Sequence, residues 1–230
     1  MSHVIFRRHT LPVAEHRAAG RIERALNAVL FGRDGVDTAW SLFVHASETI
    51  RSKMLELPIQ KNSNDPEYYR AYTKSRRACY DLMRVYHGWN HIALMAASVQ
   101  IHECIYLLDN VVAKELAVTP SIARHIDLVE FKILRKSLKK VFPNVGRVRA
   151  ALVHGGEMAV DPESHAMQAT DIGKEFGRSG YSKTVDGRMV TFPFDDASYG
   201  AYRDIISKIE IMFSDADNAV LLSYKRENRS

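Results

Sequence analysis

Two arginines and one histidine lie close together in the segment from Pro143 to Glu157, which reads PNVGRVRAALVHGGE. Arginine carries a planar, permanently charged guanidinium that can bind a phosphate through two parallel hydrogen bonds. Histidine is the side chain best suited to proton transfer near neutral pH. Arg147, Arg149 and His154 therefore have the chemical types needed to hold a phosphodiester and to act on it.

The same segment predicts a helix of about ten residues. Asn144 can cap its N-terminus, and the Gly155-Gly156 pair lies where helices commonly end in a left-handed residue. On an ideal helix, Arg147 and His154 share one face within ~20°, whereas Arg149 and His154 diverge by ~140°. Arg149 thus reaches His154 only if the helix ends early and the histidine turns back, or if the two residues come from different subunits.

This spacing resembles the Arg-x(4 to 6)-His signature of the HEPN superfamily. Arg149 and His154 fit the form with four intervening residues, and Arg147 and His154 fit the form with six. Members of that family are helical bundles that often act as metal-independent RNases in defence and toxin systems, while others have lost activity and serve as binding modules. In many members a polar residue follows the arginine, whereas Ala150 follows Arg149 here.

The resemblance implies a site and partners. His154 would be the general acid or base, and Arg147 and Arg149 would bind the phosphate and stabilise its developing charge. It further implies RNA as the substrate, no cofactor, a homodimer whose two motifs face each other, and an antitoxin-type protein as a partner.

A cluster of basic residues precedes the motif, in the last turns of a predicted helix. Its members are Lys132, Arg135, Lys136, Lys139 and Lys140. Cations near a helix C-terminus are favoured by the helix dipole, so such a cluster is typical of a solvated helix end. Because the cluster is close in sequence to Arg147, we also consider Lys136, Lys139 and Lys140 as candidates for RNA binding.

Polar side chains form a stripe along an otherwise apolar helix. The stripe contains His91, Ser98, His102 and Asp109, and His87 lies one turn earlier. Three imidazoles could bind a divalent metal in a bundle core, but the Glu-x-x-His pairs of di-metal bundles are missing, and we assign no metal. A hydrogen-bonded core or a subunit seam is the favoured interpretation. Alternatively, the stripe lines the same pocket as His154, with His102 or Glu103 orienting it.

Composition is that of an ordinary globular protein. Of the 230 residues, 46% are hydrophobic and 26% are charged, which excludes wholesale disorder, and the net charge of +5 is compatible with an anionic partner. Cys79 and Cys104 are the only cysteines, so a disulfide framework is not expected and a reducing cytoplasm fits. The N-terminus has no apolar signal region, and Gln100, His102, Glu103 and Asp109 interrupt the longest apolar segment, which argues against a membrane span.

Hydrophobic periodicity predicts one mostly α domain over residues 1–230, a bundle of about six helices with a small antiparallel β hairpin or meander before the C-terminal helix. The expected helices cover residues 13–31, 37–57, 66–86, 89–117 and 121–142, the motif helix described above, and a last long helix from Asp195 or Asp196. The breaks at 32–35 and at 88 are placed on glycines. Trp40 and Trp89 are expected in the core.

Residues 160–195 are expected to form a small β insertion. Alternating segments at Tyr181–Val185 and Arg188–Phe194 are joined by Asp186-Gly187, a dipeptide that favours the positive φ angles of a tight hairpin turn. A third strand could lie within Met167–Phe176.

Three functions remain open from the sequence. The first is a HEPN-like, metal-independent endoribonuclease acting on RNA phosphodiesters. The second is a non-catalytic helical module that binds an anionic or protein partner with the same arginines. The third is a metal-binding bundle that uses His87, His91 and His102.

Overall fold

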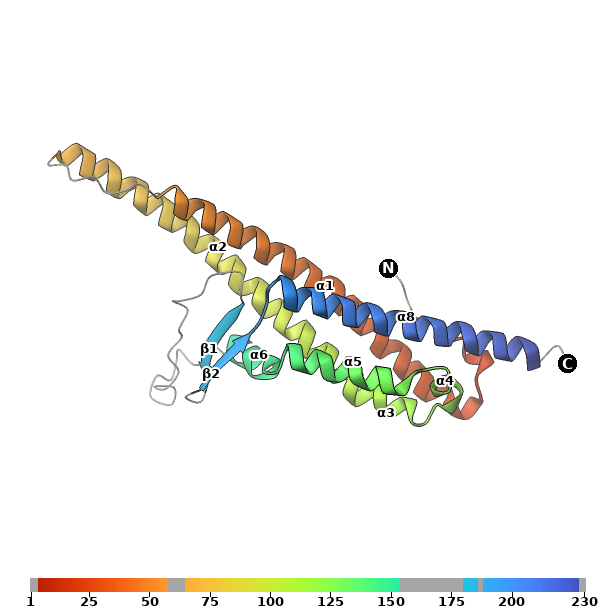
Figure 1. Ribbon diagram of the computed structural model, residues 1–230. Coiled ribbons are helices and arrows are strands. Elements are labelled where there is room, and N and C mark those ends of the chain that lie inside the picture. The colour runs from red at the N-terminus through yellow and green to blue at the C-terminus, as the bar shows by residue number, and fades with distance from the viewer. Residues whose placement is uncertain (1–3, 58–64, 154–179, 186–187, 228–230) are drawn as a thin grey trace.

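The protein is mostly α-helical, as predicted. The computed structural model describes residues 4–57, 65–153, 180–185 and 188–227. Two long helices, α1 (His16–Leu55) and α2 (Pro66–Leu107), form an antiparallel hairpin, and a third, α8 (Asp196–Glu227), lies along α1 (Figure 1). The end of α1 and the beginning of α2 extend beyond the other helices as an arm.

Shorter elements complete the bundle. A π-helical turn, η3 (Leu108–Val112), continues α2 and leads into α3 (Ala113–Leu116). Then follow α4 (Pro120–Ala123), α5 (Leu128–Val141) and α6 (Val145–Val153). Two single 3-10 turns, η1 (Arg8–Thr10) and η2 (Val13–Glu15), precede α1. The strands β1 (Tyr181–Val185) and β2 (Arg188–Phe192) lie beside α6 (Figure 1).

A single apolar core joins these elements. Its fully buried members include Ile22 of α1, Ile101 of α2, Leu138 of α5, Phe192 of β2 and Phe213 of α8. The core therefore contains residues near the beginning and residues near the end of the described chain. This is consistent with one folded unit in the described part. No described element forms a core of its own.

The expected break at residues 32–35 is wrong, because α1 runs through it without interruption. A Cβ atom on Gly32 would lie 3.1 Å from Oε1 of Gln100, and one on Gly35 would lie 3.4 Å from Cγ of the same side chain. The two glycines therefore let α2 approach α1 closely at Gln100. The sequence shows where the glycines are, but it does not show whether they end a helix or allow a neighbouring helix to approach closely.

The expected break at Gly88 is also wrong, since α2 continues through it. The start of α2 is as predicted: Asp65 accepts a hydrogen bond from the Glu67 N–H at 2.9 Å, and Pro66 occupies the first turn. The single helix expected at 121–142 is instead divided into α4 and α5, because Asp127 caps α5 by accepting hydrogen bonds from the N–H groups of Val129 and Glu130.

The hairpin prediction is confirmed. Strands β1 and β2 pair antiparallel, with Tyr181 opposite Phe192 and Val185 opposite Arg188. Gly180 precedes the first strand with φ of 106°, and a Cβ there would lie 2.1 Å from the carbonyl oxygen of Phe192, so only glycine fits. The expected third strand and most of the 160–195 insertion lie outside the described residues.

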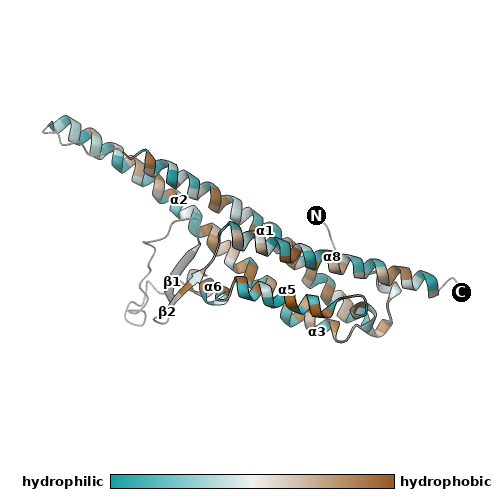
Figure 2. Cartoon of the chain, in the orientation of Figure 1, coloured by the Kyte–Doolittle hydropathy of each residue, from teal (hydrophilic) through white to brown (hydrophobic). Residues whose placement is uncertain are grey.

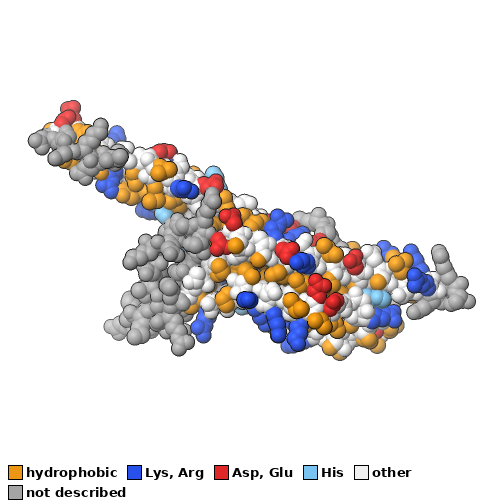
Figure 3. All heavy atoms as spheres, viewed as in Figure 1, with side chains coloured by type: hydrophobic (Ala, Val, Ile, Leu, Met, Phe, Trp, Pro, Cys, Tyr) orange, Lys and Arg blue, Asp and Glu red, His pale blue; other side chains and the backbone are white. Residues whose placement is uncertain are grey.

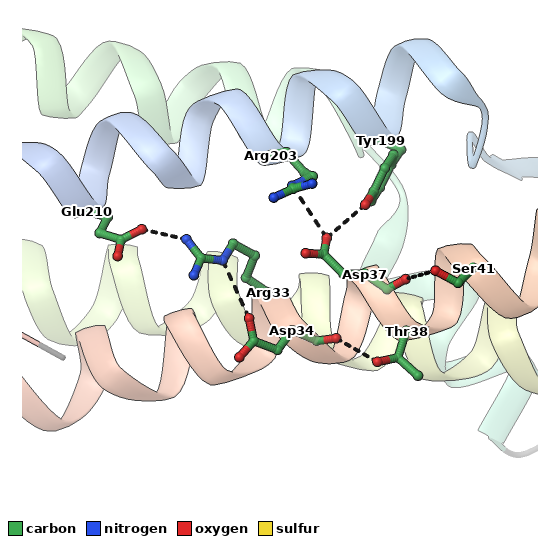
Figure 4. Close-up of polar contacts among 8 residues, drawn as sticks. All are labelled: Arg33, Asp34, Asp37, Thr38, Ser41, Tyr199, Arg203 and Glu210. Carbon is green, nitrogen blue, oxygen red and sulfur yellow. Dashed lines mark hydrogen bonds and ion pairs between the residues drawn. The ribbon is translucent and has the colours of Figure 1, made fainter. Parts of the chain in front are cut away.

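Polar contacts attach α8 to α1 (Figure 4). Arg33 donates a charge-assisted hydrogen bond to Glu210, and Asp37 accepts one from the Tyr199 hydroxyl at 3.0 Å and pairs with Arg203 at 3.6 Å. Burial and the adjacent Asp37 carboxylate raise the pKa of Tyr199, so its hydroxyl stays protonated at neutral pH. Trp40 stacks on Tyr199 with ring centroids 4.6 Å apart, which makes this cluster a structural connection between two helices.

Hydrophobic residues are frequent along the part of α2 that lies beside the other helices, whereas the outer end of the arm is mainly hydrophilic (Figure 2). The continuous helix from Pro66 to Leu116 is long and apolar enough to cross a membrane by length and composition alone, but core helices of soluble proteins pass the same test. Only 39% of its most apolar window is buried inside the protein. Trp89, expected in the core, is 38% exposed on this helix.

Candidate functional site at the contact between α2 and α6

Helix α6, which carries the two arginines, is attached to α2 by small and apolar residues. Val145 and Val148 are buried in the core. A Cβ on Gly146 would lie 3.1 Å from Cδ2 of His102 and 3.2 Å from its Nε2, so the glycine lets the helix backbone approach the imidazole. The Asn144 carbonyl accepts a hydrogen bond from the Val148 N–H at 3.0 Å, which places Asn144 just before the first helical residue, as predicted.

Both arginines of the motif point away from the core. Arg147 and Arg149 are exposed, with the buried Val148 between them. Their guanidinium groups are therefore accessible to a ligand in solution. The third residue of the motif, His154, lies outside the described residues, as do the glycines after it.

The structure does bring a different histidine close to the motif. Burial lowers the pKa of His102, the positive charge of Arg149 lowers it further, and the Glu103 carboxylate opposes both effects. The imidazole of His102 is therefore mostly neutral at pH 7, the form that can accept a proton. A neutral imidazole on α2 and a guanidinium on α6 thus share one edge of the molecule.

Glu103, the other supporting residue expected from the sequence, lies on a different side of α2. It is exposed and lines a shallow groove of about 230 Å³ together with Arg21 and Arg24 of α1. Because neighbouring residues on a helix point ~100° apart, Glu103 is directed toward α1 while His102 is directed toward α6.

The basic cluster on α5 is divided between structural and exposed residues. Asp109, in the π-helical turn, accepts a hydrogen bond from Arg135 at 2.6 Å and forms an ion pair with Lys139. Lys136 and Lys140 are exposed and form no ion pair with any described residue. Lys and Arg side chains line the edge of the molecule over α5 and α6 (Figure 3). Of the three lysines considered for RNA binding, Lys139 is therefore also part of an internal ion pair.

The polar stripe of α2 is not one site. Ser98 is fully buried and donates a hydrogen bond to the Met95 carbonyl, Asp109 is paired with α5, and His91 is exposed. His87 and His102 are 15 residues apart, which is ~22 Å along a helix. Among the described residues no group of three or more His, Cys, Asp or Glu could hold a metal ion, so the histidines do not form the centre that their spacing allows.

Comparisons with known proteins identify no relative. The chain matches no family model, no curated protein and no solved structure. The likeness to the HEPN superfamily therefore depends on the motif residues and the helical surround alone.

Sequence reasoning missed two features of the site. The first is the close approach of Gly146 to His102, for which the only signal was a glycine near the start of a short helix. The second is the pairing of Asp109 with α5, which joins the polar stripe to the basic cluster. Neither could be found from the sequence, because both depend on how α2 is rotated against its neighbours.

Proposed function

We propose that the protein is a HEPN-like, metal-independent endoribonuclease. In this proposal Arg147 and Arg149 bind the RNA phosphate, and His154 acts as general acid or base on the 2′-hydroxyl or the leaving oxygen. Attack of the 2′-oxygen on phosphorus would release the 5′-oxygen of the next nucleotide and leave a 2′,3′-cyclic phosphate. The substrate itself supplies the nucleophile, so the reaction requires no metal.

The observation that carries the proposal is the exposed basic edge on α6. Arg147 and Arg149 are both accessible, and the exposed Lys136 and Lys140 lie on the preceding helix. An RNA backbone on this edge would meet positive charge from two helices. The neutral His102 imidazole supports the same site as a hydrogen-bond partner that does not compete with the phosphate for the arginines.

The test is cleavage of mixed RNA in excess EDTA by the wild-type protein and by His154→Ala. We expect the substitution to lower the cleavage rate about 100-fold or more, because removing a general acid or base typically costs 10²–10⁴. His91→Ala is the matched control, because His91 is an exposed histidine on α2 outside the proposed site. DNA of the same sequence should remain intact, since it lacks the 2′-hydroxyl.

Two results would count against a nuclease. Cleavage that is absent in the wild type removes the activity, and equal cleavage by wild type and His154→Ala assigns it to a contaminant or to other residues. If RNA binds without being cleaved, and Arg149→Ala weakens that binding, the non-catalytic binding module is the better description. The same exposed arginines and lysines support that second function.

A further inference from the structure

The arm carries arginines and tyrosines on one side of α2, beyond the other helices of the bundle (Figure 1). Residues 66–84 contain five basic and two acidic side chains, a net charge of +3, while the whole chain has a net charge of +5. The arm therefore holds a large share of the net positive charge. We call the following residues the arm face: Tyr69, Arg70, Thr73, Arg76, Arg77, Tyr80 and Arg84.

A contact with α1 fixes the direction of the arm face. The Cys79 thiol donates a hydrogen bond to the Lys53 carbonyl at 3.2 Å, so this side of α2 lies against α1. Arg70, Arg77 and Arg84 repeat every seven residues and point roughly 140–180° away from Cys79 around the helix. All three are exposed. They form a row of positive charges, about 10 Å apart, on the side of the arm opposite α1.

Two tyrosines hold a fourth guanidinium at the edge of this row. Arg76 donates one hydrogen bond to the Tyr72 hydroxyl at 3.1 Å and another to the Tyr80 hydroxyl at 2.7 Å. Its guanidinium carbon also lies over both rings, 5.5 Å and 5.3 Å from their centroids. These contacts use two of the five guanidinium N–H groups, so three remain for a ligand. The tyrosines thus fix the side chain of Arg76 without neutralising its charge.

Carboxylates do not compensate the arginines. A solvated helix face usually pairs its cations with carboxylates three or four residues away. Asp81 has this spacing to Arg77 and Arg84, and Glu67 has it to Arg70, yet none of these pairs forms an ion pair. The positive charge of the arm face is therefore available to an anionic ligand.

We propose that the arm face binds single-stranded nucleic acid, with the arginines on phosphates and with Tyr69 and Tyr80 stacked on bases. Tyr69 is 39% exposed and Tyr80 is 46% exposed, so each ring presents surface to solvent. Single strands leave the faces of their bases open to aromatic side chains. A duplex or an acidic polypeptide would use the arginines and leave the rings without a partner. Contacts of this kind do not involve the 2′-hydroxyl, so RNA and DNA strands should both bind.

The arm face is separate from the basic edge on α6. Arg77 precedes His102 by 25 residues, which is ~37 Å along α2. Binding at the arm face does not require His154 to be catalytic, so it can be tested whether or not the protein is a nuclease. If the protein is a nuclease, the arm would hold a strand at a distance from the α6 arginines.

The first experiment measures the fluorescence anisotropy of labelled 20-nucleotide oligothymidylate and oligouridylate with the full-length His154→Ala chain, so that cleavage does not interfere. We expect dissociation constants of about 1–100 µM at physiological salt for both strands, and weaker binding of a duplex of the same length. Replacing Arg70, Arg77 and Arg84 together by alanine should weaken binding. It should also make the slope of log K against log salt shallower by about 2, since each phosphate contact on a single strand contributes ~0.7.

Matched variants separate the arm from charge in general. Arg77→Glu should weaken binding, whereas Arg17→Glu, the same charge change at an exposed arginine of α1, should not. Tyr69→Ala should weaken binding about fivefold or more, because stacking on one base contributes ~1–3 kcal/mol. Tyr69→Phe keeps the ring and should bind like the starting chain. Circular dichroism checks that each variant folds.

Four results would overturn the proposal. The first is that neither strand binds at about 100 µM, and the second is that the duplex binds as tightly as the single strands. The third is full binding by the triple alanine variant together with loss of binding in an Arg147→Ala, Arg149→Ala double variant, which would assign the strand to α6. The fourth is unchanged affinity in Tyr69→Ala. Tighter binding of polyglutamate than of either strand would show that the arm face takes an acidic polypeptide instead.

Discussion

The two faces of α2 are both apolar and yet have different surroundings. The inward face contributes Ala93, Ala97 and Ile101, which are essentially inaccessible to solvent. The outward face contributes Val85, Ile92 and Tyr106, which are about half exposed. Small residues predominate inward, where helices approach closely, and large residues outward, where no described element covers them.

The comparison shows that hydrophobicity alone does not identify the core side of a helix. A helix that is apolar around most of its circumference predicts burial on all sides. In this chain Gly32 and Gly35 of α1 lie close to Gln100 of α2, and Gly146 of α6 lies close to His102, so glycines of the neighbours mark close approaches on two sides of α2.

The largest expected effect contrasts two isoleucines of α2. Ile101→Ala should lower the free energy of unfolding by about 2–5 kcal/mol, because it leaves a cavity in a close-packed core. Ile92→Ala should lower it by less than about 0.5 kcal/mol in the monomer, since the side chain is already half in water. Urea unfolding measures both, at about 1 µM protein so that association does not contribute. Similar losses for the two variants would show that the outward face is covered within one chain.

A smaller effect is expected at Gly88. No atom lies within 4 Å of a Cβ built there, and the residue is in the middle of a continuous helix. Gly88→Ala should therefore raise the free energy of unfolding by about 0.5–1 kcal/mol, by restricting the unfolded chain. Gly32→Ala is the comparison, because its Cβ would lie 3.1 Å from Gln100 and the side chain must shift. A loss of stability in Gly88→Ala would mean that the helix bends or opens at this position.

Much of the fold could be predicted from local patterns. The cap at Asp65, the hairpin between Tyr181 and Phe192, and the last helix from Asp196 each depend on a few neighbouring residues. The predictions that were wrong concern glycines within helices, at 32, 35 and 88. A glycine in a helical pattern can end the helix, allow a neighbouring helix to approach closely, or do neither. Which of the three occurs depends on the neighbouring element.

The candidate site was predictable in its residue types but not in its neighbours. The helix carrying Arg147 and Arg149 was expected, and both are exposed on it. The position of His102 beside Arg149 depends on the rotation of α2, which no periodicity fixes when several faces are apolar. The same rotation directs Glu103 away from α6, where the sequence had offered it as a supporting residue.

The smallest expected effect tests whether α6 acts electrostatically on α2. Burial and the Arg149 charge lower the pKa of His102, so Arg149→Ala should raise that pKa toward its ordinary value. Arg147→Ala is the matched control, because Arg147 is an exposed arginine of the same helix that does not act on His102. The Hε1 resonance of His102, followed by NMR against pH, measures the change.

The same shift predicts a pH dependence of stability. A folded-state pKa below the unfolded value of about 6.5 means that the unfolded chain binds the proton first as the pH falls. Above pH ~6.5, His102 therefore does not lower the free energy of unfolding. As the pH decreases from there through the folded-state pKa, the free energy of unfolding falls. His87, whose pKa burial also lowers, acts in the same window, so the informative quantity is the difference between variants. Arg149→Ala should lose less stability on acidification than Arg147→Ala, and equal losses would place the Arg149 guanidinium too far from the imidazole to matter.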